Sequence, residues 1–162
     1  MRIKTALVFL GAAALAASAL AQTKTSGTAT CKSDPPTPVA IGDVDGHSYA
    51  MGKSQCTWTK FEIDGVPYKD GVSVFTEEIR GDKSTSSGYH TANLANGDKC
   101  ACSFRGSSTA KDGKFVSGGG TWTFTSGTGK CKGIIGNGSY QGAPNPDGTV
   151  TYRVSGKYTL SK

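Results

Sequence analysis

The sequence has few of the features by which enzymes and membrane proteins are ordinarily identified. Only two of its 162 residues are histidines, and it contains neither a G-x-S-x-G nucleophile elbow nor a complete phosphate-binding loop. No segment after the first 21 residues is apolar enough to cross a bilayer, which takes about 20 residues. Lysine and arginine form no run, so we expect no binding to nucleic acid. No reaction can be named from motifs.

The first 21 residues have the pattern of a cleaved secretory signal peptide. Arg2 and Lys4 precede an apolar stretch over residues 6–17, and small residues suited to signal peptidase stand at Ala19 and Ala21. Charge, apolar run and cleavage site in this order define such a peptide. The apolar run is too short for a membrane anchor. We therefore expect cleavage after residue 21, a mature chain without a membrane span, and a periplasmic or secreted location.

The mature chain is expected to be one small, mildly basic domain preceded by an arm. Without Arg2 and Lys4, 16 basic residues face 12 acidic ones, a net charge of +4 that allows only weak attraction to anionic surfaces. Residues 22–30 are polar and small, and three prolines follow within residues 34–38. Proline removes backbone donors and keeps a chain extended. Residues 22–40 are thus predicted to form an extended N-terminal arm, and residues 41–162 the folded domain.

The sequence from residue 41 onward is typical of an antiparallel β-meander, with no helical periodicity of useful length. Runs rich in β-branched and aromatic residues alternate with Asp-Gly and Asn-Gly pairs, which permit the positive φ angles of tight turns. These pairs begin at Asp45, Asp64, Asp70, Asn96, Asp112, Asn137 and Asp147.

Alternation with period two is clearest near the C-terminus. Val150, Tyr152, Val154 and Tyr158 share one phase, while polar residues between them take the other, so one face is packed and the other lies in water. Shorter patterns, among them a segment near Ser48–Met51 and the stretch Cys56–Ile63, bring the total to about eight strands. The sequence predicts an all-β fold, in which a single antiparallel β-barrel of about eight strands is favoured and a two-sheet β-sandwich is the alternative.

Five cysteines remain after cleavage, and in an exported protein they are expected to form disulfides. They are Cys31, Cys56, Cys100, Cys102 and Cys131. The pairing is open, and one thiol must stay free or pair between chains. Cys100 and Cys102 would share one face of a strand, so we expect no bond between them. Cys31 could tie the predicted arm to the domain. We expect no metal, because the Cys-x-Cys pair lacks the second ligand pair of a zinc site.

The glycine-rich region over residues 120–140 resembles a known hairpin. Gly120-Thr121-Trp122-Thr123-Phe124 leads into Gly127-Thr128-Gly129-Lys130 and then into residues 133–140. This succession is similar to the hairpin of the allene oxide cyclase and dirigent-like barrels, in particular that of their uncharacterised exported bacterial relatives. The resemblance implies a calycin-like barrel with a central cavity, often oligomeric, that holds or acts on small apolar molecules without a cofactor. It transfers no catalytic residue to this chain.

The leading hypothesis is therefore a binding module whose barrel holds a small apolar or aromatic molecule, with catalysis less favoured. The candidate ligand-contacting residues are His47, Trp58, His90, Trp122 and Tyr152. A simpler interpretation of the histidines has His47 capping a turn and His90 on the wet face of a strand. One alternative function is a cofactor-free isomerase or cyclase that uses His47, His90 or Glu62 as its acid–base group. A second alternative is a structural envelope or secreted protein with a filled barrel and no ligand.

Overall fold

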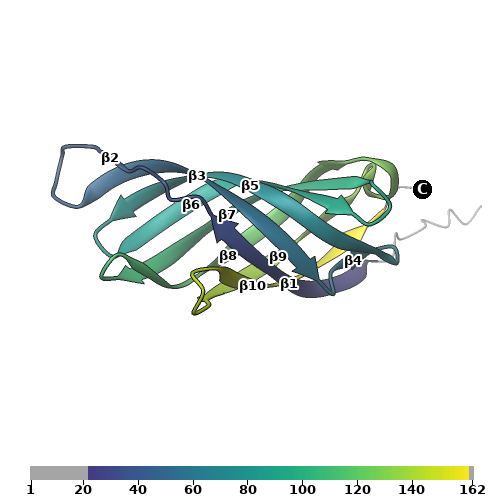
Figure 1. Ribbon diagram of the computed structural model, residues 1–162. Helices are drawn as coiled ribbons and strands as arrows, with labels where there is room; N and C mark the ends of the chain where they lie inside the picture. Colours follow the sequence, from purple (N-terminus) through teal and green to yellow (C-terminus); the bar gives the residue numbers. More distant parts are fainter. Residues whose placement is uncertain (1–21, 161–162) are drawn as a thin grey trace, which may run out of the picture.

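Eight long antiparallel strands form the fold in the computed structural model, which describes residues 22–160 (Figure 1). The predicted signal peptide lies outside the described residues. No helix within residues 22–160 is long and apolar enough to span a membrane. The long strands are β1 (Thr23–Ser33), β3 (His47–Thr59), β5 (Val66–Arg80), β6 (Lys83–Leu94), β7 (Lys99–Lys111), β8 (Lys114–Gly127), β9 (Ile135–Pro144) and β10 (Val150–Thr159).

The strands close into a barrel, which confirms the favoured fold over the sandwich. From β5 to β10 each long strand pairs antiparallel with the next, and β3 pairs with β5. The strand β1 completes the ring, because it pairs with β10 from Thr23 to Cys31 and with β3 from Thr28 to Ser33. Two short strands, β2 (Val39–Ala40) and β4 (Glu62–Ile63), extend the edges of β3 and β5, and a short 3-10 helix, η1 (Gly129–Cys131), links β8 to β9.

The prediction that residues 22–40 form an arm is wrong for most of its length, because β1 is a wall strand of the barrel. Its inward residues are small, so the sequence of β1 lacks the alternation of large apolar and polar residues from which a strand is recognised. A Cβ added to Gly27 would lie 2.7 Å from the Cβ of Phe61, so the ring-bearing residue occupies the space that a larger β1 side chain would need. Only the proline segment after Ser33 runs outside the sheet.

Most of the predicted turns are turns in the structure. Asp64 and Asp112 take left-handed backbone angles, with φ of 50° and 52°, beside glycines that do the same. Two of the pairs lie inside strands instead, because Asp70 and Gly71 belong to β5 and Gly138 belongs to β9. These glycines are required by side chains that lie against them, as described below.

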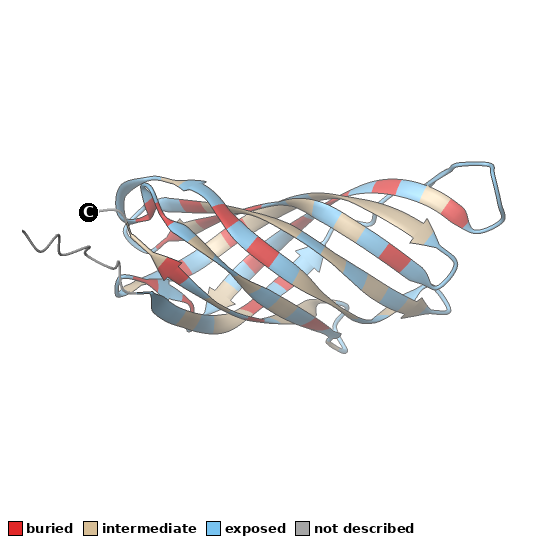
Figure 2. Cartoon of the chain, turned by 180° about the vertical axis from the view of Figure 1, so that it is seen from behind, coloured by how far each residue is buried: buried red, intermediate tan, exposed pale blue. Residues whose placement is uncertain are grey.

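The two ends of the barrel differ in packing. We call the end with turns 60–65, 95–98 and 128–134 the closed end, and the end with turns 81–82, 112–113, 145–149 and loop 34–46 the open end. Buried residues gather towards the closed end (Figure 2). The core cluster comprises Phe61, Ile63, Tyr68, Ala92, Leu94, Cys100, Trp122, Phe124, Cys131, Ile134, Val154 and Tyr158. The hydrophobic core thus fills one half of the barrel.

Two disulfides brace this arrangement, and they are compatible with an oxidising compartment. Cys31–Cys56 joins β1 to β3, and Cys100–Cys131 ties β7 to η1. Cys102 is free, so the expectation that it would not bond Cys100 is confirmed.

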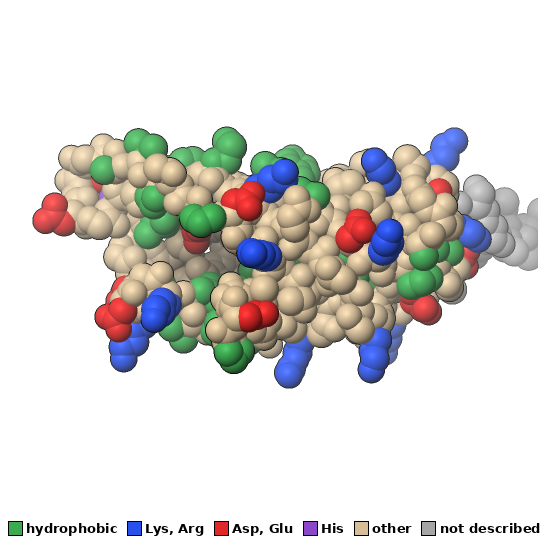
Figure 3. All heavy atoms as spheres, viewed as in Figure 1, with side chains coloured by type: hydrophobic (Ala, Val, Ile, Leu, Met, Phe, Trp, Pro, Cys, Tyr) green, Lys and Arg blue, Asp and Glu red, His purple; other side chains and the backbone are tan. Residues whose placement is uncertain are grey.

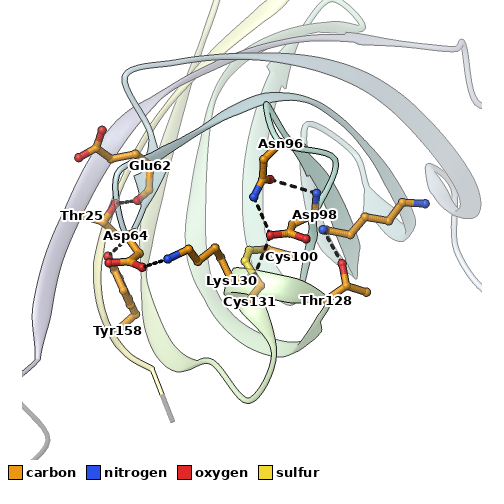
Figure 4. Close-up of a disulfide and its surroundings, with 11 residues drawn as sticks. Thr25, Glu62, Asp64, Asn96, Asp98, Cys100, Thr128, Lys130, Cys131 and Tyr158 are labelled. Atoms are coloured by element: carbon orange, nitrogen blue, oxygen red, sulfur yellow. Dashed lines mark hydrogen bonds and ion pairs between the residues drawn. A yellow bond between two sulfur atoms is a disulfide. The ribbon is translucent and has the colours of Figure 1, made fainter. Parts of the chain in front are cut away.

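Polar contacts surround the second disulfide at the closed end (Figure 4). Lys130 Nζ lies 2.6 Å from a carboxylate oxygen of Asp64, and the backbone N–H of Lys130 donates to Asp98 at 2.9 Å. The N–H of Asp64 in turn donates to the hydroxyl of Tyr158 at 2.9 Å. These bonds hold the closed-end turns to one another across the end of the barrel.

Candidate ligand-binding cavity

A cavity of about 360 Å³ lies inside the barrel between the aromatic core and the open end. Small-molecule sites in proteins commonly fall between about 300 and 1,000 Å³. The surface is visibly hollowed towards the end that carries β2 (Figure 3). The cavity exists because small side chains line the open half of the barrel, where they cannot meet across it. They are Ser33, Ser54, Ser73, Ser86, Ser107, Ser108, Gly118 and Gly119.

Glycines in the wall allow aromatic rings to lie flat against the strands. A Cβ on Gly138 would come 2.7 Å from Cζ2 of Trp122, and one on Gly120 would come 2.8 Å from the hydroxyl of Tyr140. Similar contacts pair Gly52 with Phe75, Gly71 with His90 and Gly142 with Tyr152. The sequence is therefore rich in glycine for two reasons: glycine forms the turns, and on the inner wall it leaves space for aromatic rings.

His90 lies inside the barrel, which corrects the interpretation that placed it on the wet face. The indole N–H of Trp58 donates to Nε2 of His90 at 3.2 Å, so Nε2 is unprotonated and Nδ1 carries the proton. Nδ1 then donates to the hydroxyl of Ser73 at 2.9 Å. Burial lowers the pKa of His90 to about 4, which keeps the ring neutral at pH 7.

Three further titratable groups of the inner wall, Cys102, Tyr140 and Tyr152, are uncharged at neutral pH as well. Burial raises the pKa of the Cys102 thiol to about 12 and that of the Tyr140 phenol to about 12. Burial, followed by the charge of Glu77, raises the pKa of Tyr152 above its ordinary value. The middle of the cavity is thus an apolar and aromatic environment with neutral polar groups.

Two buried polar atoms in the cavity wall have no hydrogen-bond partner within residues 22–160. They are the hydroxyl of Tyr68 and the indole N–H of Trp122, and both side chains line the cavity. Tyr68 is 6% exposed and Trp122 5%. Burying an unpaired donor costs about 1–3 kcal/mol. A ligand that accepts a hydrogen bond from either group would recover part of that free energy.

A carboxylate lines the cavity nearer its mouth. Glu77 of β5 faces inward and accepts a hydrogen bond from the hydroxyl of Ser84. The hydroxyls of Ser84 and Ser108 lie 2.7 Å apart. Since the single proton of Ser84 is directed at Glu77, Ser108 must donate to Ser84. This serine pair fixes the position of the carboxylate.

The structure brings four of the five predicted ligand-contacting residues to the cavity. Trp58, His90, Trp122 and Tyr152 all line it. His47 is not among the lining residues. It lies at the open end, where its Nδ1 is 2.5 Å from Asp43 and its Nε2 is 3.1 Å from Glu78.

Hence His47 fastens loop 34–46 to β5, in agreement with its interpretation as a turn residue. Glu62, the carboxylate considered for catalysis, is exposed on β4, away from the cavity.

Glu77 was missed by sequence analysis because the hydrophobic phase of its strand is misleading. On β5 the inward residues are Ser73, Phe75 and Glu77, whereas Val74 points outward and is 50% exposed. The adjacent pair Glu77–Glu78 does indicate that one of the two carboxylates must face inward, since neighbours on a strand point to opposite sides. That signal alone could not tell which residue it is.

Comparisons with known proteins add no family assignment, since no family model matches the chain and no curated protein is significantly similar to it. Within residues 22–160 no group of three or more His, Cys, Asp or Glu side chains is placed to hold a metal ion. The functional argument therefore rests on the geometry of the cavity.

Proposed function

We propose that the protein is exported to the periplasm or the medium and binds a small apolar or aromatic molecule inside its barrel. The cavity of about 360 Å³ has room for such a molecule. Most of its contacts would be with aromatic rings, and apolar contact area is the main source of affinity in sites of this kind. The two disulfides agree with a location outside the cytoplasm.

The observation that carries the proposal is the pair of unpaired polar atoms in a hollow, largely apolar interior. The indole N–H of Trp122 and the hydroxyl of Tyr68 are buried and line the cavity. A ligand with a carbonyl, ether or hydroxyl oxygen at its inner end would accept hydrogen bonds there. Its apolar body would then lie between Trp58 and Tyr152.

The structural alternative receives less support, and so does an isomerase that uses one of the three bases considered from the sequence, His47, His90 or Glu62. A general base needs a free lone pair beside the substrate, but Nε2 of His90 already accepts from Trp58, and Nδ1 is bonded to Ser73. His47 and Glu62 lie outside the cavity. A purely structural barrel would be expected to fill its interior, as this barrel does only at its closed end.

Binding can be tested with N-phenyl-1-naphthylamine, a small uncharged dye that fluoresces in apolar surroundings. We expect a saturable signal from the disulfide-bonded protein and competition by small aromatic alcohols. Native mass spectrometry of protein purified from its own host should reveal a retained small molecule that denaturation releases. Absence of a saturable dye signal would overturn the proposal.

A pair of variants localises the signal to the cavity. Ser86 lines the cavity on β6, whereas its neighbour Ser87 is exposed on the outer face. Ser86→Phe should weaken dye binding by about ten-fold or more, because the added ring occupies the cavity. Ser87→Phe should leave binding unchanged. Thermal unfolding of both variants identifies any loss that comes from misfolding.

A further inference from the structure

The cavity carries a single charge, and that charge is negative. Among the described residues that line it, no lysine, arginine or aspartate occurs, His90 is neutral at pH 7, and Glu77 is the only carboxylate. We propose that the ligand is a cation, an aromatic or aliphatic amine or ammonium compound whose charged group is held by Glu77. This inference rests on the proposed binding function and specifies the chemical class that the cavity selects.

The charge of Glu77 is not neutralised by the protein. No Lys, Arg or His nitrogen within residues 22–160 forms an ion pair with Glu77. Its outward neighbour Glu78 contrasts with it, because Arg80 lies 2.8 Å from the Glu78 carboxylate and His47 3.1 Å. Cations of the chain thus compensate the outer carboxylate and leave the inner one to attract a cation from solution.

The Ser84–Ser108 pair prepares Glu77 for this role. The hydroxyl of Ser84 donates to one carboxylate oxygen, Oε1. The hydroxyl of Ser108, on the neighbouring strand β7, donates to that of Ser84. The other carboxylate oxygen has no side-chain donor of its own within residues 22–160, so it is free to accept from an ammonium group.

Aromatic rings form a belt beside Glu77 that suits a cation equally well. Phe75 stands two residues before Glu77 on the same face of β5. From Phe75 the belt continues through Phe104, Tyr140 and Tyr152, with successive ring centroids 6.4, 6.2 and 5.9 Å apart. The face of an aromatic ring attracts a cation, and the attraction grows when both are desolvated. Carboxylate and belt together form a cation site in the barrel wall, with the carboxylate nearer the mouth of the cavity.

The same arrangement disfavours anions. A carboxylate ligand would bring its charge into an interior that offers no basic residue and already holds Glu77. Like charges repel more strongly in a poorly solvated space than in water. The cavity should therefore distinguish amines from acids of the same size and shape.

The test uses three ligands that differ only in one terminal group: 4-phenylbutylamine, 4-phenylbutanol and 4-phenylbutyrate. Each competes with N-phenyl-1-naphthylamine for the disulfide-bonded protein at pH 7 and low salt. We expect the amine to bind at least about ten-fold more tightly than the acid, and the affinity of the alcohol to lie between the two. This comparison needs no variant, so it remains decisive even where a substitution impairs folding.

Glu77→Gln should weaken binding of the amine by about ten-fold and leave binding of the alcohol within about two-fold. The matched control is Glu62→Gln, which removes the same charge from an exposed position on β4 and should change neither affinity. Equal binding of amine and acid by the wild type, with the dye still bound, would overturn the cation site alone. Failure of the dye itself to bind would instead remove the proposed function.

Discussion

The closed and open ends of the barrel are built from the same strands, yet one is packed and the other is hollow. At the closed end Phe61 lies within 5.0 Å of Trp58 and 4.7 Å of Tyr68, measured between ring centroids. At the open end most inward positions carry serine or glycine, and the few larger residues there, such as Phe115, do not fill the interior. Strand number and backbone geometry are shared, so the volume of the inward side chains decides where an eight-stranded barrel is filled.

The open end is held together on its outside. His47 joins Asp43 of loop 34–46 to Glu78 of β5, and Arg80 adds a second contact to Glu78. Hydrogen bonding to His47 lowers the pKa of Asp43, and bonds to Arg80 and then His47 lower that of Glu78. Polar contacts at the rim thus substitute for a core and leave the interior open. The free energy of unfolding should therefore respond differently at the two ends to truncation of a side chain and to addition of a methyl group at a wall glycine. Acid pH should act mainly through the histidine between them.

The largest difference should follow from truncating one phenylalanine at each end. Phe61→Ala at the closed end removes a side chain that is 2% exposed, and we expect a loss of about 3–5 kcal/mol in the free energy of unfolding. Phe115→Ala at the open end removes a half-buried ring beside an existing cavity and should cost about 1 kcal/mol. Urea denaturation measures both. Equal losses would contradict the contrast between a packed and a hollow end.

The pH dependence of stability should reveal the buried histidine between the two ends. The pKa of His90 is lowered from 6.5 to about 4 in the folded protein, so between these values the unfolded chain binds a proton that the folded protein does not. Stability is therefore full above pH 6.5 and falls as the pH drops towards 4, by on the order of 3 kcal/mol. Thermal unfolding between pH 7 and pH 4 measures the slope.

His90→Gln should flatten this profile. His47→Gln is the control, because its partners Asp43 and Glu78 are exposed to solvent and contribute little to the slope. A profile that stays equally steep in His90→Gln would show that other groups cause the acid sensitivity.

The smallest effect concerns the glycines of the wall. In Gly138→Ala the new Cβ would lie 2.7 Å from Trp122 Cζ2 and closer still to the carbonyl of Ser155, so we expect a loss of about 1–3 kcal/mol. In Gly118→Ala the nearest atoms lie farther away, Cε2 of Phe115 and Cβ of Ser108 at 3.0 Å and the carbonyl oxygen of Ser107 at 3.1 Å, so shifts of a few tenths of an ångström would accommodate the methyl group. We expect that loss to stay below about 1 kcal/mol. Chemical denaturation of the two variants gives the comparison.

Much of the fold could be predicted because strands with one packed face leave a clear mark. Val150, Tyr152, Val154 and Tyr158 all point inward on β10, as their period indicated. The expected count of about eight strands agrees with the eight long strands, although their identities differ. Two predicted segments, near Ser48–Met51 and from residue 56, are parts of the single strand β3, and β1 was taken for an arm.

The remainder could not be predicted because its cause lies in partners distant in the chain. Gly27 is required because Phe61 lies against it, and Gly138 because Trp122 does. Neither contact can be inferred from the neighbouring sequence.

Trp58, Trp122 and Tyr152 were identified as cavity-lining positions, since bulky rings on the packed phase face the interior. His90 was a candidate because its ring can titrate, and its inward position did not follow from the strand pattern. Glu77 escaped notice because a charged residue on an inward phase is rare, and a local pattern treats it as a break in that phase.

The closing pair of strands determines how the molecule can be attached to something else. Thr23 lies opposite Tyr158, so the first and last strands begin and finish side by side at the closed end, away from the end that carries β2 (Figure 1). The cavity opens towards that other end. A tag, tether or fused domain at either terminus would therefore leave the mouth facing away from the attachment point. The same proximity would let a short linker join the two termini, with new ends opened at the Asp112–Gly113 turn to give a circular permutant.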